Sequence, residues 1–228
     1  MTAVGTMDKS SPMKLISVNV SLPQTVMYQG KSVTTGIFKK AVNGRVMLRK
    51  LNLEGDQQAD RKVHGGVDMA VYAYPIEHYR YWQSALARAA FPYGQFGENL
   101  TVEGLTEKDV RVGDVIAIGE ARLQATQPRI PCYKLVMRMD AGSDFAARFL
   151  QSGRLGFYLR VLQEGMLEAG DVITLAERDD HSLTIAEFIQ IYASKSQDPV
   201  MLERVLAARD LGDAWRQYFE KRLQTSQS

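Results

Sequence analysis

The chain has 228 residues, of which 45% are hydrophobic and one is a cysteine, and its formal net charge is +2. This charge is too small for a typical nucleic-acid-binding protein, no apolar run reaches the roughly twenty residues of a membrane span, and no secretory signal opens the sequence. We therefore expect a cytoplasmic protein that binds neither nucleic acid nor membrane. A single cysteine excludes an intramolecular disulfide, a CxxC redox pair, and a conventional cysteine-ligated iron–sulfur cluster or structural zinc site.

The first part of the chain has the pattern of a β-rich domain. Residues 1–12 are polar and aperiodic, which is typical of a disordered leader or an expression remnant. After them, short runs rich in β-branched and aromatic residues are separated by Gly, Asn and Asp. The Gly119-Glu120 pair predicts a tight hairpin, and this many short strands favour a β-barrel or sandwich over residues 13–180. The predicted strands cover 15–20, 32–37, 45–48, 70–74, 100–102, 115–118, 121–126, 157–162 and 172–175.

Helices are predicted within this domain and after it. Apolar residues share one face over 76–89, with Pro75 at the helix start, and a shorter helix over 143–151 has Ser143 as its cap. After Asp180 the pattern becomes helical, and a capping box at Thr184 and Glu187 opens the first of three helices, predicted over 184–194, 198–208 and 213–223. Acidic and basic residues balance there, which argues against a DNA-reading helix-turn-helix. We expect a separate three-helix domain over 181–228.

The lone cysteine lies in the segment Gln127-Pro128-Arg129-Ile130-Pro131-Cys132-Tyr133-Lys134. The two prolines fix φ and remove two backbone donors, so the segment is predicted to be an ordered loop and not a helix or central strand. An unpaired cysteine is most often a small buried hydrophobe. Here, however, Arg129 and Lys134 favour the thiolate form of Cys132, and the preceding strand delivers the loop to an end of the sheet, where sites tend to be built.

A second concentration of functional residue types is Asp60-Arg61-Lys62-Val63-His64-Gly65-Gly66-Val67-Asp68. Paired glycines after a histidine let the backbone approach a ligand and offer N–H donors, and a simple β-turn is the alternative. His64, Asp68 and His78 lack zinc-ligand spacing, and His78 is expected on the exposed face of its helix. Between Lys31 and Lys62 stand eight basic and three acidic residues. This excess suits a small phosphorylated ligand or, alternatively, a solvated face.

Two shorter stretches could also contact a ligand. Glu98 and Asn99 follow a loop rich in glycine and precede a strand, and Thr35 lies in Thr34-Thr35-Gly36 at the end of another strand. Glu98 and Asn99 could contact a ligand, or Asn99 could simply satisfy the turn, and Thr34-Thr35-Gly36 could bind an anion or merely end its strand. No P-loop and no GxGxxG motif occurs, which counts against nucleotide binding by those routes.

Taken together and in order, six stretches of this chain resemble MOSC-domain proteins of the YiiM-like group. The resemblance spans about residues 15–177, and the three helices after it resemble the three-α domain that follows in this group. It implies a mainly β protein with helices, whose MOSC core is β-barrel-like, of the pyruvate-kinase-barrel type, followed by a small three-helix domain. The stretches are 30–36, 55–60, His64-Gly65-Gly66, Phe96-Gly97-Glu98-Asn99, 127–134 and Gly156-Phe157-Tyr158.

The resemblance also implies a function. It implies a molybdopterin-type molybdenum cofactor, with Cys132 as the protein ligand to molybdenum, and the reduction of N-hydroxylated compounds such as hydroxylaminopurines to amines. A thiolate is a soft ligand that suits this metal, and because the pterin brings two dithiolene sulfurs of its own, one cysteine suffices. Candidates for stabilising cofactor charge or the thiolate are Arg129 and Lys134. Candidates for the phosphate side and other anion contacts are Thr35, Lys39, Arg61, His64, Gly65 and Gly66, and candidates for pterin amide contacts or proton delivery are Asp60, Glu98 and Asn99.

The chain has no flavin, haem or iron–sulfur motif, so an external electron-donor protein is implied as a partner. An alternative function is sulfur transfer, with a persulfide carried on Cys132. A third interpretation treats the C-terminal helices as a docking module and the barrel as a scaffold. The sequence leaves open the physiological substrate, a homodimer and whether recombinant protein contains the cofactor.

Overall fold

The computed structural model of the chain describes residues 12–59 and 65–226. An eight-stranded sheet forms the body of the protein, in the order β12-β8-β9-β10-β6-β7-β1-β4. Neighbouring strands run antiparallel except β6 and β7, which are parallel. The strands are β1 (Lys14–Val20), β4 (Lys40–Val42), β6 (Val71–Pro75), β7 (Leu100–Glu103), β8 (Val115–Ile118), β9 (Ala121–Pro128), β10 (Phe157–Gln163) and β12 (Ile173–Glu177).

The sheet curls toward a barrel but does not close. An isolated bridge joins Lys14 at the start of β1 to Val172 just before β12, and the Leu15 N–H donates to the Asp171 carbonyl at 2.9 Å. Nevertheless β12 and β4 remain the two edges of the sheet. The predicted fold class is therefore confirmed in its large sheet and C-terminal helices, whereas the core is an open, strongly curled sheet and not a closed barrel.

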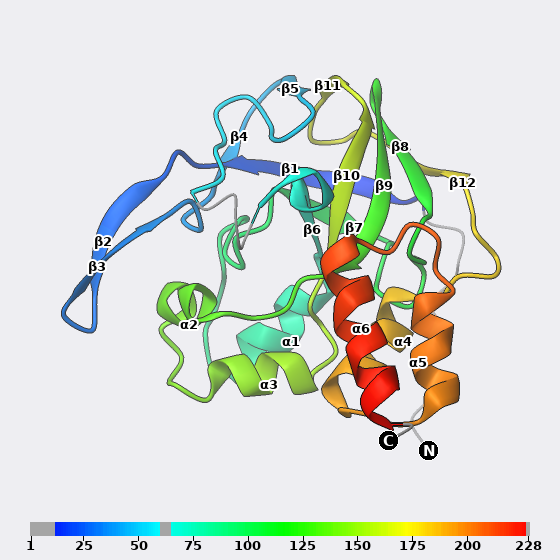
Figure 1. Cartoon of the computed structure of the whole chain (residues 1–228). Helices are drawn as coiled ribbons and strands as arrows, with labels where there is room; N and C mark the ends of the chain where they lie inside the picture. The colour runs from blue at the N-terminus through cyan, green and yellow to red at the C-terminus, as the bar shows by residue number, and fades with distance from the viewer. Residues whose placement is uncertain (1–11, 60–64, 227–228) are drawn as a thin grey trace, which may run out of the picture.

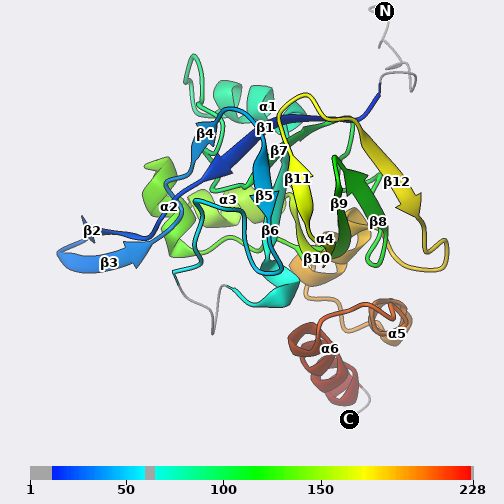
Figure 2. The ribbon, with the colours of Figure 1, turned by 90° about the horizontal axis from the view of Figure 1, so that it is seen from above.

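Two small sheets complete the β structure. β2 (Gln24–Tyr28) and β3 (Lys31–Thr35) form a hairpin that extends away from the body of the protein (Figures 1 and 2). β5 (Val46–Leu48) pairs with β11 (Gly165–Leu167). The sequence pattern missed β2, β4 and β11, and it predicted correctly the β8–β9 hairpin, in which Ile118 pairs with Ala121 across Gly119-Glu120.

The helices fall into two groups (Figure 1). α1 (Glu77–Ala85), α2 (Tyr133–Met139) and α3 (Phe145–Gln151) lie at one end of the sheet, and a 3-10 turn, η1 (Val67–Met69), precedes β6. The C-terminal group consists of α4 (Ile185–Ala193), α5 (Pro199–Leu206) and α6 (Asp213–Ser226). Among the described residues, no helix is both long and apolar enough to cross a membrane.

The capping predictions have mixed outcomes. The capping box of α4 is present, because the Thr184 hydroxyl accepts from the Glu187 N–H while the Glu187 carboxylate accepts from the Thr184 N–H. Asp198 caps α5 as predicted. In contrast, Ser143 is not the cap of α3, whose N-cap position is Asp144. The helix predicted over 76–89 is shorter, because its proline is the last residue of β6 and the chain leaves the helix after Ala85.

His78 corrects a further expectation. Its side chain is buried and not on an exposed helix face. The Nε2 atom lies 2.7 Å from the Glu107 carboxylate, which also accepts the Gly156 N–H at 2.6 Å. The bond to Glu107 offsets the cost of burying the ring, and His78 lies on the same buried face of α1 as Tyr79 and Trp82.

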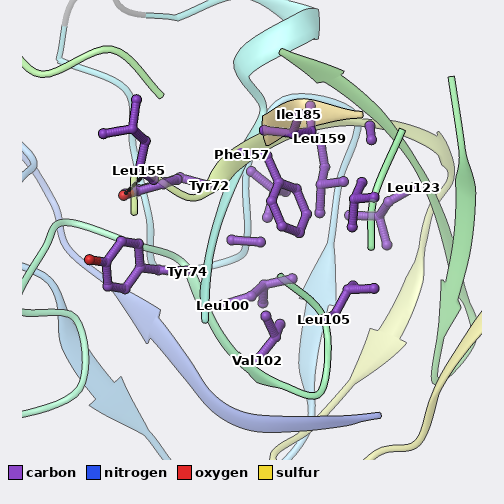
Figure 3. Close-up of a cluster of buried hydrophobic side chains, with 14 of the residues drawn as sticks. Tyr72, Tyr74, Leu100, Val102, Leu105, Leu123, Leu155, Phe157, Leu159 and Ile185 are labelled. Atoms are coloured by element: carbon purple, nitrogen blue, oxygen red, sulfur yellow. Dashed lines mark hydrogen bonds between the residues drawn. The ribbon is translucent and has the colours of Figure 1, made fainter. Parts of the chain in front are cut away.

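One hydrophobic core joins the sheet to both helix groups. Its side chains come from the central strands and from α4, whose first residue, Ile185, is fully buried (Figure 3). The Ile185 N–H also donates to the Val110 carbonyl at 2.8 Å. Large-to-small substitutions at such positions typically cost about 2–5 kcal/mol. The C-terminal helices are thus anchored through shared core packing.

Candidate active site

A cavity opens beside the ends of β3, β6 and β9 and is lined by segments that are far apart in the sequence. Because short strands end here, their terminal residues and the loops that follow bring polar side chains together. Six of the residues predicted for the site from the sequence line this cavity. They are Thr35, Lys39, Asn99, Arg129, Cys132 and Lys134.

Cys132 reaches the cavity through a strand, a short turn and a helix. β9 continues to Pro128, which lies opposite Phe157 of β10, and α2 begins at Tyr133 with Cys132 at the N-cap position in extended geometry. The predicted loop is therefore wrong in extent, because a proline is tolerated at a strand end and another can precede a helix. The Cys132 side chain is partly exposed and lines the cavity.

Arg129 is a buried cation at this cavity. It is 5% exposed, its backbone N–H donates to the Gly156 carbonyl at 3.2 Å, and its guanidinium carbon lies 5.8 Å from the centre of the Tyr72 ring. Burial opposes its charge, but the ionisable groups of Cys132 and Tyr72 outweigh this effect and raise the pKa of Arg129. No carboxylate in the described part of the chain forms an ion pair with it. Since a buried charge needs compensation, this arrangement favours an anionic ligand.

Lys39 has its own partner. Its Nζ lies 2.5 Å from Asp56 Oδ1, and both side chains are nearly buried. Asp56 also accepts hydrogen bonds from the Ser21 N–H at 2.8 Å and from Asn99 Nδ2 at 2.9 Å. Lys39 is thereby neutralised and held in the wall. Lys134, partly exposed at the rim, adds to the charge of Arg129, so the described lining of the cavity is net positive.

Two tyrosines form part of the cavity wall. Tyr72 and Tyr158 lie opposite each other on β6 and β10, with ring centres 5.4 Å apart. Burial raises the pKa of both hydroxyls, so both stay protonated at neutral pH. The Tyr72 hydroxyl donates to the Leu155 carbonyl at 2.7 Å. For Tyr158, burial is the main cause of the raised pKa and the nearby Arg129 guanidinium opposes it, and no acceptor for the hydroxyl proton occurs among the described residues.

The remaining predicted residues lie elsewhere. Glu98 is fully buried behind the cavity, where its carboxylate accepts from the backbone of Gly94 and Phe96 and from the Thr101 and Tyr79 hydroxyls. Its role is to hold a loop, and burial raises its pKa. Gly65 and Gly66 do not line the cavity either. Three predicted residues lie outside the described residues: Asp60, Arg61 and His64.

Among the lining residues to which sequence reasoning assigned no role, three stand in the family-like stretches and carry polar side chains close to the predicted ones. Asp56 and Gln58 belong to the 55–60 stretch that supported the resemblance, and Tyr158 belongs to Gly156-Phe157-Tyr158, but no role was assigned to them. Gln58 fixes the backbone of Gly66, whose N–H donates to Gln58 Oε1 at 2.9 Å. The position of these residues within two family-like stretches was the signal that could have identified them.

The described residues include no cluster of three or more His, Cys, Asp or Glu side chains that could hold a metal ion. The lining instead offers one thiol, a buried unpaired cation and hydrogen-bonding groups from Asn99 and Tyr158. This donor set fits a negatively charged group that itself supplies most of the ligands to its metal.

Comparison with known proteins decides the family. A model of the MOSC domain matches residues 60–174, and a model of the YiiM-like 3-alpha helix domain matches residues 183–226. The uncharacterized protein YflK of Bacillus subtilis (strain 168) is 39% identical over 214 residues, which cover 94% of this chain and 96% of YflK. The chain belongs to the MOSC family.

Other relatives of this MOSC protein agree with its architecture. The crystal structure of YiiM from Geobacillus stearothermophilus has a TM-score of 0.78 at 38% identity and covers 93% of this chain and 100% of that one. A protein named reductase from Gibberella moniliformis (strain M3125 / FGSC 7600) is 33% identical over 152 residues. These residues are 65% of this MOSC protein and 27% of the fungal protein, so the likeness covers one part of a longer chain.

Proposed function

We propose that this MOSC protein binds a molybdopterin-type molybdenum cofactor in the cavity and with it reduces N-hydroxylated compounds to amines. The observation that carries the proposal is the pairing of a partly exposed cysteine with a buried cation that lacks a carboxylate partner, both on one cavity. Membership of the MOSC family and the name of the fungal relative support it.

The residues present fit such a cofactor. Cys132 would supply the protein's thiolate ligand to the metal, and Arg129 with Lys134 would compensate the negative charge of the pterin phosphate and the sulfurs. Thr35 and Asn99 present polar groups on the same wall, where Asn99 is oriented by its bond to Asp56. When bound, the cofactor supplies two-electron redox chemistry that no side chain of this protein provides.

The overall reaction consumes two electrons and two protons. The N–O bond of R–NHOH breaks, one new O–H and one new N–H bond form, and the products are R–NH₂ and water. The electrons come from an external donor protein, for which a small chemical reductant can substitute. We assign the Tyr158 hydroxyl as hydrogen-bond donor to the oxygen of the substrate, because its proton has no acceptor among the described residues and it faces the cavity that contains Cys132.

The test measures metal and turnover together. Wild-type protein from a host that makes the cofactor should contain about one molybdenum per chain and reduce 6-hydroxylaminopurine with reduced methyl viologen. Cys132→Ser should lose the metal and the turnover. Tyr133→Phe is a matched control in the same segment, since the Tyr133 side chain is 52% exposed and does not line the cavity.

Two outcomes would overturn the proposal. The first is wild-type protein that takes up no molybdenum in a competent host, and the second is a Cys132→Ser variant that keeps both molybdenum and turnover. A labile sulfur on Cys132, detected by mass spectrometry in protein without molybdenum, would support sulfur transfer instead.

A further inference from the structure

The C-terminal helices contact the cavity domain through a charged junction. Arg160 projects from β10 between two carboxylates on different segments. Its Nη2 lies 2.7 Å from Oδ1 of Asp68 in η1, and its Nη1 lies 3.9 Å from Oδ1 of Asp210 in the turn between α5 and α6. Nη2 also approaches the Asp210 carbonyl at 3.5 Å. One guanidinium therefore joins β10, η1 and the helical domain.

The α5–α6 turn also approaches η1 closely. A Cβ atom added at Gly212 would lie 3.1 Å from the Asp68 carboxylate and 3.6 Å from Gln127 Oε1. The backbone of the helical domain thus lies almost in van der Waals contact with the residue that Arg160 holds. On its other side Asp68 is fixed by Thr126, whose hydroxyl donates to the Asp68 carbonyl at 2.7 Å.

The segment held in this way is also a wall of the cavity. Met69 and Ala70, directly after Asp68, line the cavity, and so does Gln58. The Gln58 amide exchanges hydrogen bonds with Gly66 at 2.9 and 3.4 Å and donates to the Met69 carbonyl at 3.3 Å. Residues 66–70 are therefore held from the cavity side by Gln58 and from the opposite side by Arg160.

An ion pair that is partly exposed adds little to global stability, typically about 0.2–1 kcal/mol, so its main consequence is geometric. We propose that Arg160 is a positioning residue: through Asp68 it fixes residues 66–70 against the cavity, and through Asp210 it makes this arrangement depend on the three-helix domain. The three-helix domain thereby acquires a function in shaping the site. The placement of residues 66–70 does not require the proposed chemistry, and only the kinetic readout below rests on the proposed function.

Hydrogen–deuterium exchange of the full chain, purified without cofactor, tests the placement directly. In Arg160→Met and Asp68→Asn, amides of residues 66–70 should exchange about two- to five-fold faster than in wild type, the factor that corresponds to losing one partly exposed ion pair. Arg160→Lys should recover part of the protection. Arg122→Met is the control. Arg122 lies on the neighbouring strand β9, and its Nη2 forms a more exposed ion pair with Glu177 Oε1 at 2.5 Å, with no ion pair to η1.

Asp210→Asn tests the contribution of the helical domain. Faster exchange at residues 66–70 in this variant supports the proposal, and unchanged exchange there overturns the link to the three-helix domain. Equal exchange in wild type, Arg160→Met and Asp68→Asn overturns the positioning role altogether, as does an equal effect of Arg122→Met. If the enzyme is active, Arg160→Met should raise KM about two- to five-fold with kcat within two-fold, and a fall in kcat alone would contradict the proposal.

Discussion

Replacing Asp56 by Asn removes the only charge that compensates Lys39 among the described residues. The two side chains are 4% and 9% exposed and their charged atoms lie 2.5 Å apart, so the variant would leave a cation almost without solvent. Breaking a buried pair by removing one partner costs about 3–5 kcal/mol. Since a domain is stable by only about 5–15 kcal/mol, urea unfolding at pH 7 should show a large loss of unfolding free energy with an unchanged slope.

The double variant Lys39→Met, Asp56→Asn separates charge compensation from packing. It contains no isolated charge and should lose only about 1–2 kcal/mol, the value of a few hydrogen bonds. Glu177→Gln is the control, because its pair with Arg122 has the same 2.5 Å separation but exposures of 40% and 65%, and it should cost less than about 1 kcal/mol. A loss below about 1 kcal/mol for Asp56→Asn, or a double variant worse than the single one, would refute the reasoning.

Three further predictions concern single sites. Tyr158→Phe should raise KM for an N-hydroxylated substrate about ten-fold in steady-state assays at unchanged molybdenum content, since one hydrogen bond is lost. An unchanged KM would contradict the proposed hydrogen bond from Tyr158 to the substrate. Gly156→Ala should cost about 3 kcal/mol in urea unfolding, because φ is +68° and the new Cβ would lie 2.4 Å from the Ala73 carbonyl; a small loss contradicts the clash. Burial raises the pKa of Glu187, but bonds from Thr184 and Arg204 outweigh it and hold this pKa below its usual range, so the stabilisation exists above pH 4.5 and disappears as pH falls through the lowered pKa. Glu187→Gln should therefore be about 0.5 kcal/mol less stable than wild type at pH 7, with a difference that shrinks as pH falls below 4.5, and a difference that does not change with pH would contradict a role for the ionised carboxylate.

Local chemistry made part of the fold predictable. The capping box at Thr184 and the turn at Gly119-Glu120 depend on residues within a few positions of one another, so they could be recognised from the sequence. β4 and β11 have three residues each and exist because distant strands pair with them, which no local pattern reveals. α2 was hidden by the neighbouring prolines, although Pro131 lies just ahead of its N-cap.

The site was predictable to the extent that its residues stand in short motifs. Cys132 and Arg129 were identified in this way and share one cavity. Asp56 was not, because its function depends on Lys39 and Asn99, which are 17 and 43 positions away. Glu98 and Asn99 are adjacent in one predicted motif, but only Asn99 lines the cavity, whereas the fully buried carboxylate of Glu98 accepts hydrogen bonds from the loop backbone at Gly94 and Phe96.

The central claim is that Cys132 is the protein ligand of a molybdenum cofactor. Molybdenum K-edge X-ray absorption on metal-loaded protein counts the sulfur neighbours of the metal. We predict three sulfurs in wild type, two from the pterin and one from Cys132. A count of only two sulfurs in metal-loaded wild-type protein would contradict the account.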